Sequence, residues 1–303
     1  MRTRIAFAVA FAVSSLSIAV WSHAAKTETP SKQAVKHAYI FSDIGAKRVF
    51  KMSAAGKIEW EYPADQCTDI WMLKNGNILM SFTGKKRGVR EVSPDKKVVW
   101  EYLTKSEVWG CQRLPNGDTM IGEGSARRII EVNREGKIVK TVNIPSGGNK
   151  HMGMRHARKT AKGTYLVGLL ADKAVREFDA SGKMIREIKV PNMAYSMVRL
   201  KNGNTVIGYR DGVIEVDPKD KVVWHLTQKD LPDIKLHWIC CVQRLPNGNT
   251  VVNNWFIHKR RKDGVPFFEV TPDKKVVWRA KMHERMYDPT AIQILDVKDT
   301  SLR

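Results

Sequence analysis

Short apolar runs separated by polar turns recur along most of the chain. Residues 243–250 read QRLPNGNT and residues 112–119 read QRLPNGDT, and looser copies follow Leu73, Leu200 and Thr160. Because Asn and Gly tolerate positive φ, an Asn-Gly pair between apolar runs is typical of a tight β-hairpin. We therefore expect a pair of antiparallel strands around each copy.

A second strand–turn–strand motif alternates with the first. It reads EVSPDKKVVW at residues 91–100, EVDPKDKVVW at 215–224 and EVTPDKKVVW at 269–278. The lysine of this motif recurs as Lys57, Lys97, Lys137, Lys183, Lys221 and Lys275. Two hairpins in a unit of roughly 40 residues are the pattern of a four-stranded propeller blade.

The repeats predict six blades, one of which is assembled from both ends of the chain. Complete blades begin near Thr68, Trp109, Met154, Tyr195 and Cys240. Residues 38–42 read as a second strand without a first, and residues 290–295 read as a first strand with nothing after it. Pairing these two segments would close the ring and remove its free edges. The predicted fold is all-β: a six-bladed β-propeller of four-stranded blades over residues 37–303.

The N-terminal segment has the features of a secretory signal peptide. After a basic start, residues 5–20 are apolar, and Ser22 and Ala24 place small residues at the cleavage-determining positions. The apolar run is short for a membrane span, although an uncleaved anchor is the alternative. We expect a signal peptide at 1–24, a disordered lead-in at 25–36, and a periplasmic or secreted monomer without stable membrane insertion.

The net charge of the chain indicates a class of binding partner. The chain has 52 Lys and Arg against 31 Asp and Glu, a formal charge of +21. Outside the cytoplasm, such a charge favours an anionic glycan or other polyanion as partner, rather than nucleic acid. The alternative is a solvated lysine-rich surface, since many of these lysines lie in the turn repeats.

Four cysteines, Cys67, Cys111, Cys240 and Cys241, are present. In an oxidising compartment disulfides are expected, and four cysteines allow three connectivities. The neighbours Cys240 and Cys241 either form a vicinal disulfide or face opposite sides of one strand, which is the commoner outcome.

The repeats also carry a resemblance to known proteins. The forms R-L-x-N-G-N-T and E-V-x-P-x-x-K-V-V-W resemble those of secreted propellers in the quinoprotein-like and arylsulfotransferase-like superfamilies. The resemblance covers essentially the whole mature chain, but it concerns turns and packing positions. The resemblance implies the fold. The cofactor-binding residues of quinoproteins are not found in this chain. The catalytic residues of arylsulfotransferases, which centre on a histidine, cannot be placed on residues of this chain. The recurring Trp60, Trp100, Trp224 and Trp278 and the repeated Glu are expected to pack between blades.

Residues that break the repeat are the candidates for function. The loops opposite the repeated turns share one face, where a binding site is expected at the mouth of the central channel. Aligning the first strands gives two rows at that mouth. One row is Asp69, Gly110, His156, Ser196, Cys241 and Ala291; the other is Thr68, Trp109, Arg155, Tyr195, Cys240 and Thr290. Their variety and polarity indicate a ligand site, although channel mouths are often polar for structural reasons.

The longest loops on that face belong to the blade that begins at Cys240. Residues 226–239 and 256–265, with the strand ends beside them, carry His237, Trp238, Trp255, Phe256, His258, Lys259, Arg260 and Arg261, and His151 and Met152 face the same opening. Aromatic faces stack on sugars, and Arg and Lys pair with carboxylate or sulfate, so the set suits an acidic saccharide. The alternative is an ordinary solvated charge run. The predicted ligand-binding residues are Asp69, Trp109, His151, His237, Trp238, Cys240, Cys241, Trp255, His258, Arg260 and Arg261.

Three functions remain open from the sequence. The first hypothesis is a protein that binds an anionic or glycan ligand without chemistry of its own. The second is an enzyme on acidic or sulfated saccharides, lyase- or sulfotransferase-like, with His156 and Tyr195 as base and acid and Arg155 neutralising a substrate carboxylate. The third is a protein-interaction platform.

The sequence gives little sign of a cofactor. It contains no CxxC, HExxH, P-loop or GxSxG motif, and no cofactor or metal ligand set is predicted. A calcium site would need several convergent oxygens, for which the candidates are Asp69, Glu123, Asn192 and Asn254.

Overall fold

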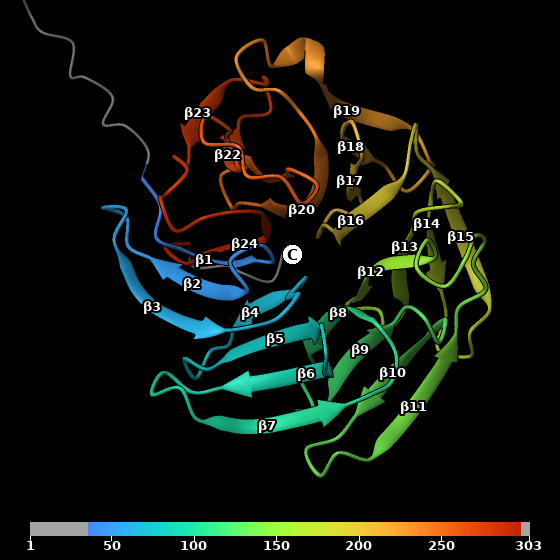
Figure 1. Ribbon diagram of the computed structural model, residues 1–303. Coiled ribbons are helices and arrows are strands. Elements are labelled where there is room, and N and C mark those ends of the chain that lie inside the picture. The colour runs from blue at the N-terminus through green and yellow to red at the C-terminus, as the bar shows by residue number, and fades with distance from the viewer. Residues whose placement is uncertain (1–35, 298–303) are drawn as a thin grey trace, which may run out of the picture. The chain divides into compact units, whose positions relative to one another are not determined.

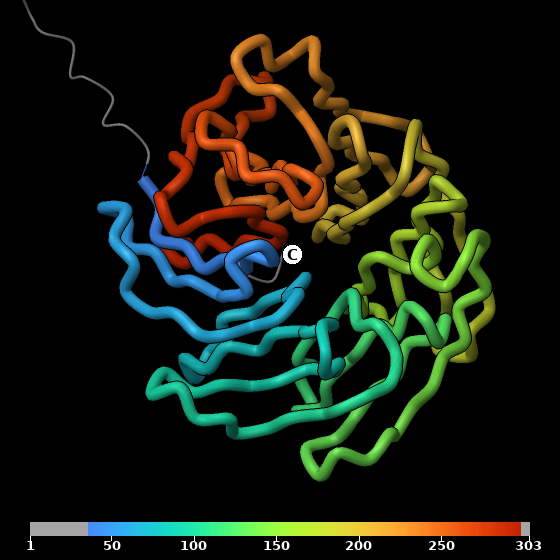
Figure 2. The backbone as a smooth tube through the Cα atoms, viewed as in Figure 1, coloured from blue at the N-terminus to red at the C-terminus, as the bar shows by residue number. Residues whose placement is uncertain are grey.

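The computed structural model describes residues 36–297 and contains six four-stranded antiparallel sheets arranged as blades of a ring (Figures 1 and 2). This confirms the predicted all-β, six-bladed propeller. The predicted signal peptide and nearly all of the lead-in lie outside the described residues. Within residues 36–297, the helical content is one 3-10 turn, Gln228–Asp230, and no helix there is long and apolar enough to cross a membrane.

Each blade has four strands in the predicted order from the centre outward. The six inner strands are β24 (Pro289–Ile294), β4 (Ile70–Met72), β8 (Val108–Arg113), β12 (Met154–Lys159), β16 (Ala194–Arg199) and β20 (Trp238–Arg244). The second strands are β1 (Tyr39–Asp43), β5 (Ile78–Thr83), β9 (Thr119–Glu123), β13 (Tyr165–Leu169), β17 (Thr205–Tyr209) and β21 (Thr250–Trp255). The third strands are β2 (Arg48–Met52), β6 (Arg87–Val92), β10 (Arg128–Val132), β14 (Ala174–Phe178), β18 (Gly212–Val216) and β22 (Phe267–Val270). The outer strands are β3 (Ile58–Pro63), β7 (Val98–Leu103), β11 (Ile138–Asn143), β15 (Met184–Lys189), β19 (Val222–Thr227) and β23 (Val276–Arg279). In this order of strands they form blades 1 to 6.

Blade 1 closes the ring as predicted. Strand β24 pairs antiparallel with β1, with Tyr39 opposite Ile294 and Ser42 opposite Ala291. Strand β24 also packs against β20 of blade 6 and β4 of blade 2. The two ends of the described chain therefore complete one sheet, and this sheet closes the ring.

The Asn-Gly repeats form the hairpins that set this register. In the QRLPNGNT copy, the backbone N–H of Leu245 donates to the carbonyl of Asn249 at 2.8 Å, and that of Gly248 donates to Leu245 at 3.0 Å. Gly248 has a φ of 87°, a conformation that a side chain disfavours. The turn fixes the alternation of the flanking strands and so decides which side chains face each neighbouring blade.

The repeated tryptophans and glutamates join neighbouring blades. The indole N–H of Trp224 in blade 5 donates to the carbonyl of Pro272 in blade 6 at 2.8 Å. Glu215 of blade 5 accepts from Asn204 of its own blade and from Arg244 of blade 6, each at 2.7 Å. The same inter-blade pairing joins Glu91 to Arg113, Glu131 to Lys159, Glu177 to Arg199 and Glu269 to His37. These repeated residues are structural, as the sequence predicts.

The junction between blades 6 and 1 differs because a histidine replaces the usual Arg or Lys. The Nε2 atom of His37 lies 2.7 Å from Glu269, and its Nδ1 atom lies 3.1 Å from Asp296. Burial opposes the charge on His37, but the hydrogen bonds to Glu269 and Asp296 outweigh it and raise its pKa. Burial likewise acts against the Glu269 carboxylate, yet its bond to His37 leaves the Glu269 pKa below the ordinary value.

This junction predicts a pH dependence of stability. A raised His37 pKa stabilises the fold below the unfolded-state value of about 6.5 and loses that contribution as pH rises through the folded-state pKa. The lowered Glu269 pKa stabilises above about pH 4.3 and is lost as pH falls, so the junction is strongest between these limits. We expect wild type to lose about 1 kcal/mol more than His37→Arg between pH 5.5 and 8.5 in urea denaturation. Parallel pH profiles for the two proteins would contradict this role of His37.

Candidate functional site

A β-bulge positions the candidate site. It lies in the inner strands, at the end that points to the loop face, the face opposite the repeated turns. The pairing register shifts in β8, β12, β16, β20 and where β1 meets β24, and each shift leaves one extra residue. The extra residues are Trp109, Arg155, Tyr195, Cys240 and Thr290, and in blade 2 Thr68 lies just before β4. A β-bulge re-aims a side chain, so the row that the sequence alignment predicted coincides with a ring of re-aimed residues.

Three members of this row bond to the neighbouring blade; we call Cys240, Thr290 and Thr68 the bonded arc. The Cys240 thiol donates to the carbonyl of Thr290 at 3.0 Å. The Thr290 hydroxyl donates to the carbonyl of Cys67 at 2.9 Å, and that of Thr68 donates to Val108 at 3.2 Å. In blades 6, 1 and 2 these residues therefore form hydrogen bonds from one inner strand to the next blade.

The other three members, Trp109, Arg155 and Tyr195, form what we call the open arc of blades 3, 4 and 5. The Arg155 guanidinium carbon lies 3.9 Å from the centre of the Trp109 ring and 5.9 Å from that of Tyr195. Arg155 is only 6% exposed. Among residues 36–297, none forms a hydrogen bond or ion pair with the Arg155 side chain, and its Nε atom and the Trp109 indole N–H are buried without an acceptor.

The electrostatics of the open arc favour an added anion. Burial lowers the pKa of Arg155, against the opposing effects of Tyr195 and Glu107. An arginine nevertheless stays charged at neutral pH, and a buried charge without a partner is unfavourable. Burial also raises the pKa of Tyr195, so that its hydroxyl stays neutral and able to donate. A bound anion would offset the unfavourable free energy of burying the Arg155 charge without an ion-pair partner.

Aromatic rings extend from both ends of the open arc. His151 contacts Trp109 edge-on, with ring centres 5.7 Å apart, and its Nδ1 lies 3.3 Å from Glu107. At the other end, Trp238 and Trp255 lie 5.8 and 5.9 Å from the Tyr195 ring. These rings offer faces and edges of the kind that contact sugars and other flat groups.

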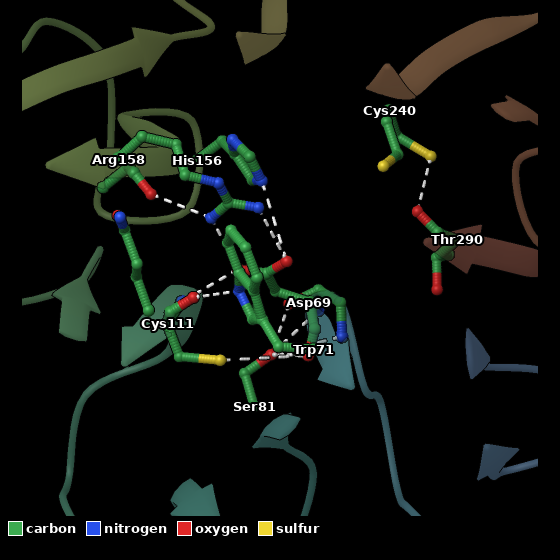
Figure 3. A network of polar contacts seen from close by, with 12 residues as sticks. Asp69, Trp71, Ser81, Cys111, His156, Arg158, Cys240 and Thr290 are labelled. Carbon is green, nitrogen blue, oxygen red and sulfur yellow. Dashed lines mark hydrogen bonds and ion pairs between the residues drawn. The ribbon is translucent and has the colours of Figure 1, made fainter. Parts of the chain in front are cut away.

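Asp69 and His156 lie in a separate, buried network (Figure 3). The two oxygens of Asp69 accept from the two terminal nitrogens of Arg158 at 2.7 and 2.9 Å, and one also accepts from the backbone N–H of Cys111 at 2.9 Å. The Nε2 atom of His156 lies 3.9 Å from Asp69. Burial acts to raise the pKa of Asp69, but Arg158 and His156 hold it well below its ordinary range. The network joins blades 2, 3 and 4, so Asp69 serves the ring's integrity whatever else it does.

A set of glutamines that cap the inner strands is not among the residues predicted from the sequence. Gln243 accepts the backbone N–H of Ile294 at 2.9 Å, and Gln293 accepts that of Met72 at 2.7 Å. Gln112 likewise accepts from Lys159 at 2.8 Å. The signal was present, because Gln precedes Arg in both QRLPNG copies. An inner strand is an edge of its sheet, and these side chains satisfy its free N–H groups.

The predicted residues of the two long loops separate into two places. Trp238 and Trp255 are paired across β20 and β21 and face Tyr195. His237, Arg260 and Arg261 instead line a cavity of about 400 Å³ within blade 6. His258 is 72% exposed and contacts the Trp255 ring edge-on, with centres 5.0 Å apart.

The expected disulfides do not form: all four cysteines are free thiols and are buried. The reason is that each packs in a different hydrophobic cluster. Cys240 packs with Tyr195 and Trp255, whereas its neighbour Cys241 packs with Phe41. Of the two alternatives for this pair, the vicinal disulfide is absent, and the two side chains pack in different clusters, as expected for neighbours that face opposite sides of a strand.

The calcium hypothesis gains no candidate site from the described part of the chain, in which no three His, Cys, Asp or Glu side chains are placed to hold a metal. Each of the four oxygen donors considered has another partner. Asp69 pairs with Arg158, Glu123 with Arg128, Asn192 with Asp211, and Asn254 with the backbone of His237.

Comparison with known proteins finds similarity in structure alone. No protein-family model matches the chain, and no curated protein matches its sequence. A solved protein of unknown function from Bacteroides caccae is similar with a TM-score of 0.75 and 21% identity, over 88% of this chain and 100% of that one. A catalytically inactive virginiamycin B lyase from Staphylococcus aureus, solved with quinupristin, is similar with a TM-score of 0.61 and 12% identity, over 88% and 93%. A streptogramin B lyase gives 0.60 and 13%, over 82% and 83%. At these identities each likeness shows the fold alone, and the chain is a six-bladed β-propeller similar to these proteins in architecture.

Proposed function

We propose that this protein binds an anionic ligand at the open arc of Trp109, Arg155 and Tyr195. One observation carries the proposal: Arg155 is a buried cation whose side chain forms no hydrogen bond or salt bridge with a described residue, and Glu107 acts on it only from beyond ion-pair distance. The bulge in β12 directs this residue at the loop-face end of the inner strands. Charged groups are rarely buried without a partner, so an external anion is the natural partner.

The chemistry of the arc suits a carboxylate or sulfate on a flat scaffold. A guanidinium stacked on an indole keeps its N–H edge available for two parallel hydrogen bonds to such a group. Trp109 lies on one side of Arg155, and the neutral Tyr195 hydroxyl and the Trp238 and Trp255 rings lie towards the other. An acidic saccharide combines a carboxylate or sulfate with a ring face, and we propose this ligand class.

Binding is better supported than catalysis. The enzymatic hypothesis assigns acid–base chemistry to His156 and Tyr195, but His156 lies against the Asp69–Arg158 pair. Two of the similar structures are named as lyases, yet at 12 and 13% identity their likeness transfers no residue role. We further propose a periplasmic or secreted location, on the signal-peptide features of residues 1–24.

Calorimetric titration of the purified protein tests this function. The ligands are sulfate, digalacturonate and a sulfated disaccharide, each compared with a neutral disaccharide. We expect at least one anion to bind and Arg155→Met to weaken it by about 30-fold or more, since truncating a buried, hydrogen-bonded charge costs about 2 kcal/mol or more.

A matched control separates the site from overall charge. Arg134 also lies over a tryptophan, 5.9 Å from the Trp100 ring, but at the turn between β10 and β11. Arg134→Met removes the same charge and is expected to retain binding. Equal losses in the two variants, or no anion that binds better than the neutral sugar, would reject the proposal.

A further inference from the structure

Blade 6 contains a cavity that is lined differently from the open arc. Its volume is about 400 Å³, and it lies between the connection that precedes β20 and the loop that joins β21 to β22. Its basic side consists of Lys235, Arg260, Arg261 and Lys262, and its walls include Asp233, Asp263, His237 and Phe256. A cavity of this size lies within the range of small-molecule sites.

The cations of this cavity are largely uncompensated. Of the two acidic residues, Asp233 lies 3.5 Å from Arg279 on the neighbouring strand β23, and Asp263 is exposed and forms no ion pair with a described cation. Within the described chain, no carboxylate lies within ion-pair distance of Lys235, Arg261 or Lys262, and the Nε atom of Arg261 is buried without an acceptor. Three cations therefore border one cavity without an acidic partner.

The lowered pKa of His237 is a second sign of the positive charge around this cavity. Burial, followed by the charges of Arg261 and Lys235, lowers the His237 pKa to about 4. The ring is therefore neutral at physiological pH and retains one donor and one acceptor nitrogen. Its ring packs edge-on against Phe256, with centres 5.5 Å apart, which closes one wall of the cavity.

The basic loop is held in an unusual backbone conformation. Ile257 and His258 have φ values of 58° and 60°, in the left-handed region that a β-branched residue such as Ile rarely adopts. Asp288 holds this segment, because one of its oxygens accepts the backbone N–H of His258 and the indole N–H of Trp255, each at 2.8 Å. Strained segments that the surrounding structure fixes are common at ligand clamps. The anchor fixes the start of the loop that carries Arg260, Arg261 and Lys262, so less ordering is needed on binding.

We propose that this cavity is a second anion-binding site, for a compact ligand with two or more negative charges, such as a phosphorylated or sulfated small molecule. Several cations around one cavity without an ion-pair partner favour a polyvalent oxyanion over a single carboxylate. The cavity shares no lining residue with the open arc, so the inference goes beyond the proposed function and stands or falls separately from it.

Titration calorimetry with pyrophosphate, glucose 6-phosphate, glucose 6-sulfate and glucose tests the site. We expect saturable binding of at least one charged probe and none of glucose, and the phosphate and sulfate probes distinguish the two oxyanions. Arg261→Gln combined with Lys262→Gln is expected to weaken binding about tenfold or more, and Lys235→Gln alone should weaken it in the same direction.

The control is Lys219→Gln combined with Lys221→Gln, which removes the same charge from the exposed turn between β18 and β19. The lysine control is expected to leave probe binding unchanged. Arg155→Met shows how much of any glucose 6-sulfate binding belongs to the open arc, and circular dichroism checks that each variant is folded. No saturable binding, or equal weakening by the cavity variants and the lysine control, would overturn the second site. Weakening by Arg155→Met alone would assign the probe to the open arc and also overturn it.

Discussion

Replacing Arg155 by Met is expected to stabilise the protein while it removes anion binding. In the absence of ligand, wild type keeps a largely buried guanidinium that forms no salt bridge with a described residue and whose Nε atom is buried without an acceptor. Methionine has a comparable length and no charge to desolvate. Replacing even a buried ion pair by apolar side chains of similar volume is often neutral or stabilising by about 1 to 4 kcal/mol, and Arg155 lacks the attraction that such a pair would provide. Thermal unfolding monitored by circular dichroism should show a melting temperature higher by several degrees, at about 2 to 4 °C for each kcal/mol.

Arg158→Met is the matched control for this prediction. Arg158 lies on the same strand, β12, and is also buried, but it pairs with Asp69. Removing it leaves a buried carboxylate without its cation, so Arg158→Met should lower the melting temperature. If both substitutions destabilise the protein to the same extent, Arg155 has a structural partner and the binding proposal loses its basis.

Asp69→Asn is expected to cause the largest loss of stability of the changes considered. Side-chain exposure is 1% for Asp69 and 4% for Arg158, so the substitution leaves a buried arginine without its opposite charge. Breaking such a pair costs about 3 to 5 kcal/mol. Urea denaturation at pH 7 measures the loss as a lower midpoint. The introduced amide would keep an oxygen for the N–H of Cys111, so the loss isolates the charge pair rather than the backbone contact.

The pH dependence of stability and the double variant of Asp69 and Arg158 test the same ion pair. Because the Asp69 pKa is lowered in the folded state, its contribution is present above the unfolded-state value of about 3.9 and is lost as pH falls. The difference between wild type and Asp69→Asn should therefore shrink in acid. Adding Arg158→Met to Asp69→Asn should recover part of the loss, because the uncompensated charge is removed. Strictly additive losses would show that the two side chains act independently.

The architecture could be predicted from the sequence because it depends on local, repeated signals. The Asn-Gly turns fix the hairpins, and each hairpin fixes the alternation of its strands. The closure of blade 1 followed from counting strands, since residues 38–42 and 290–295 each lacked a partner. The structure places these strands at Tyr39–Asp43 and Pro289–Ile294, within one residue of that prediction.

The candidate site could be predicted only in part. Alignment placed Trp109, Arg155 and Tyr195 in one row, but nothing local distinguishes them from Cys240 and Thr290. That difference depends on which side chains reach a carbonyl on the next blade, which is a matter of distances in the folded ring. The sequence likewise could not show that Arg158 spans from blade 4 to Asp69 in blade 2, since the two are 89 residues apart.

The loops of blade 6 show a related limit. The sequence grouped His237 with Trp238 and Phe256 with Trp255, because they are neighbours in the chain. The paired strands β20 and β21 end at the two tryptophans, which contact Tyr195, whereas His237 and Phe256 lie one residue beyond these strand ends and line the separate cavity. One predicted ligand surface became two candidate sites for this reason.

Locating a bound anion tests the central claim most directly. Crystals of the protein soaked in selenate would give an anomalous signal at each oxyanion site. The account predicts a peak within hydrogen-bonding distance of the Arg155 guanidinium, beside Trp109, which disappears in crystals of Arg155→Met. Full-occupancy selenate elsewhere with no peak at Arg155, or a peak that persists in Arg155→Met, would contradict it.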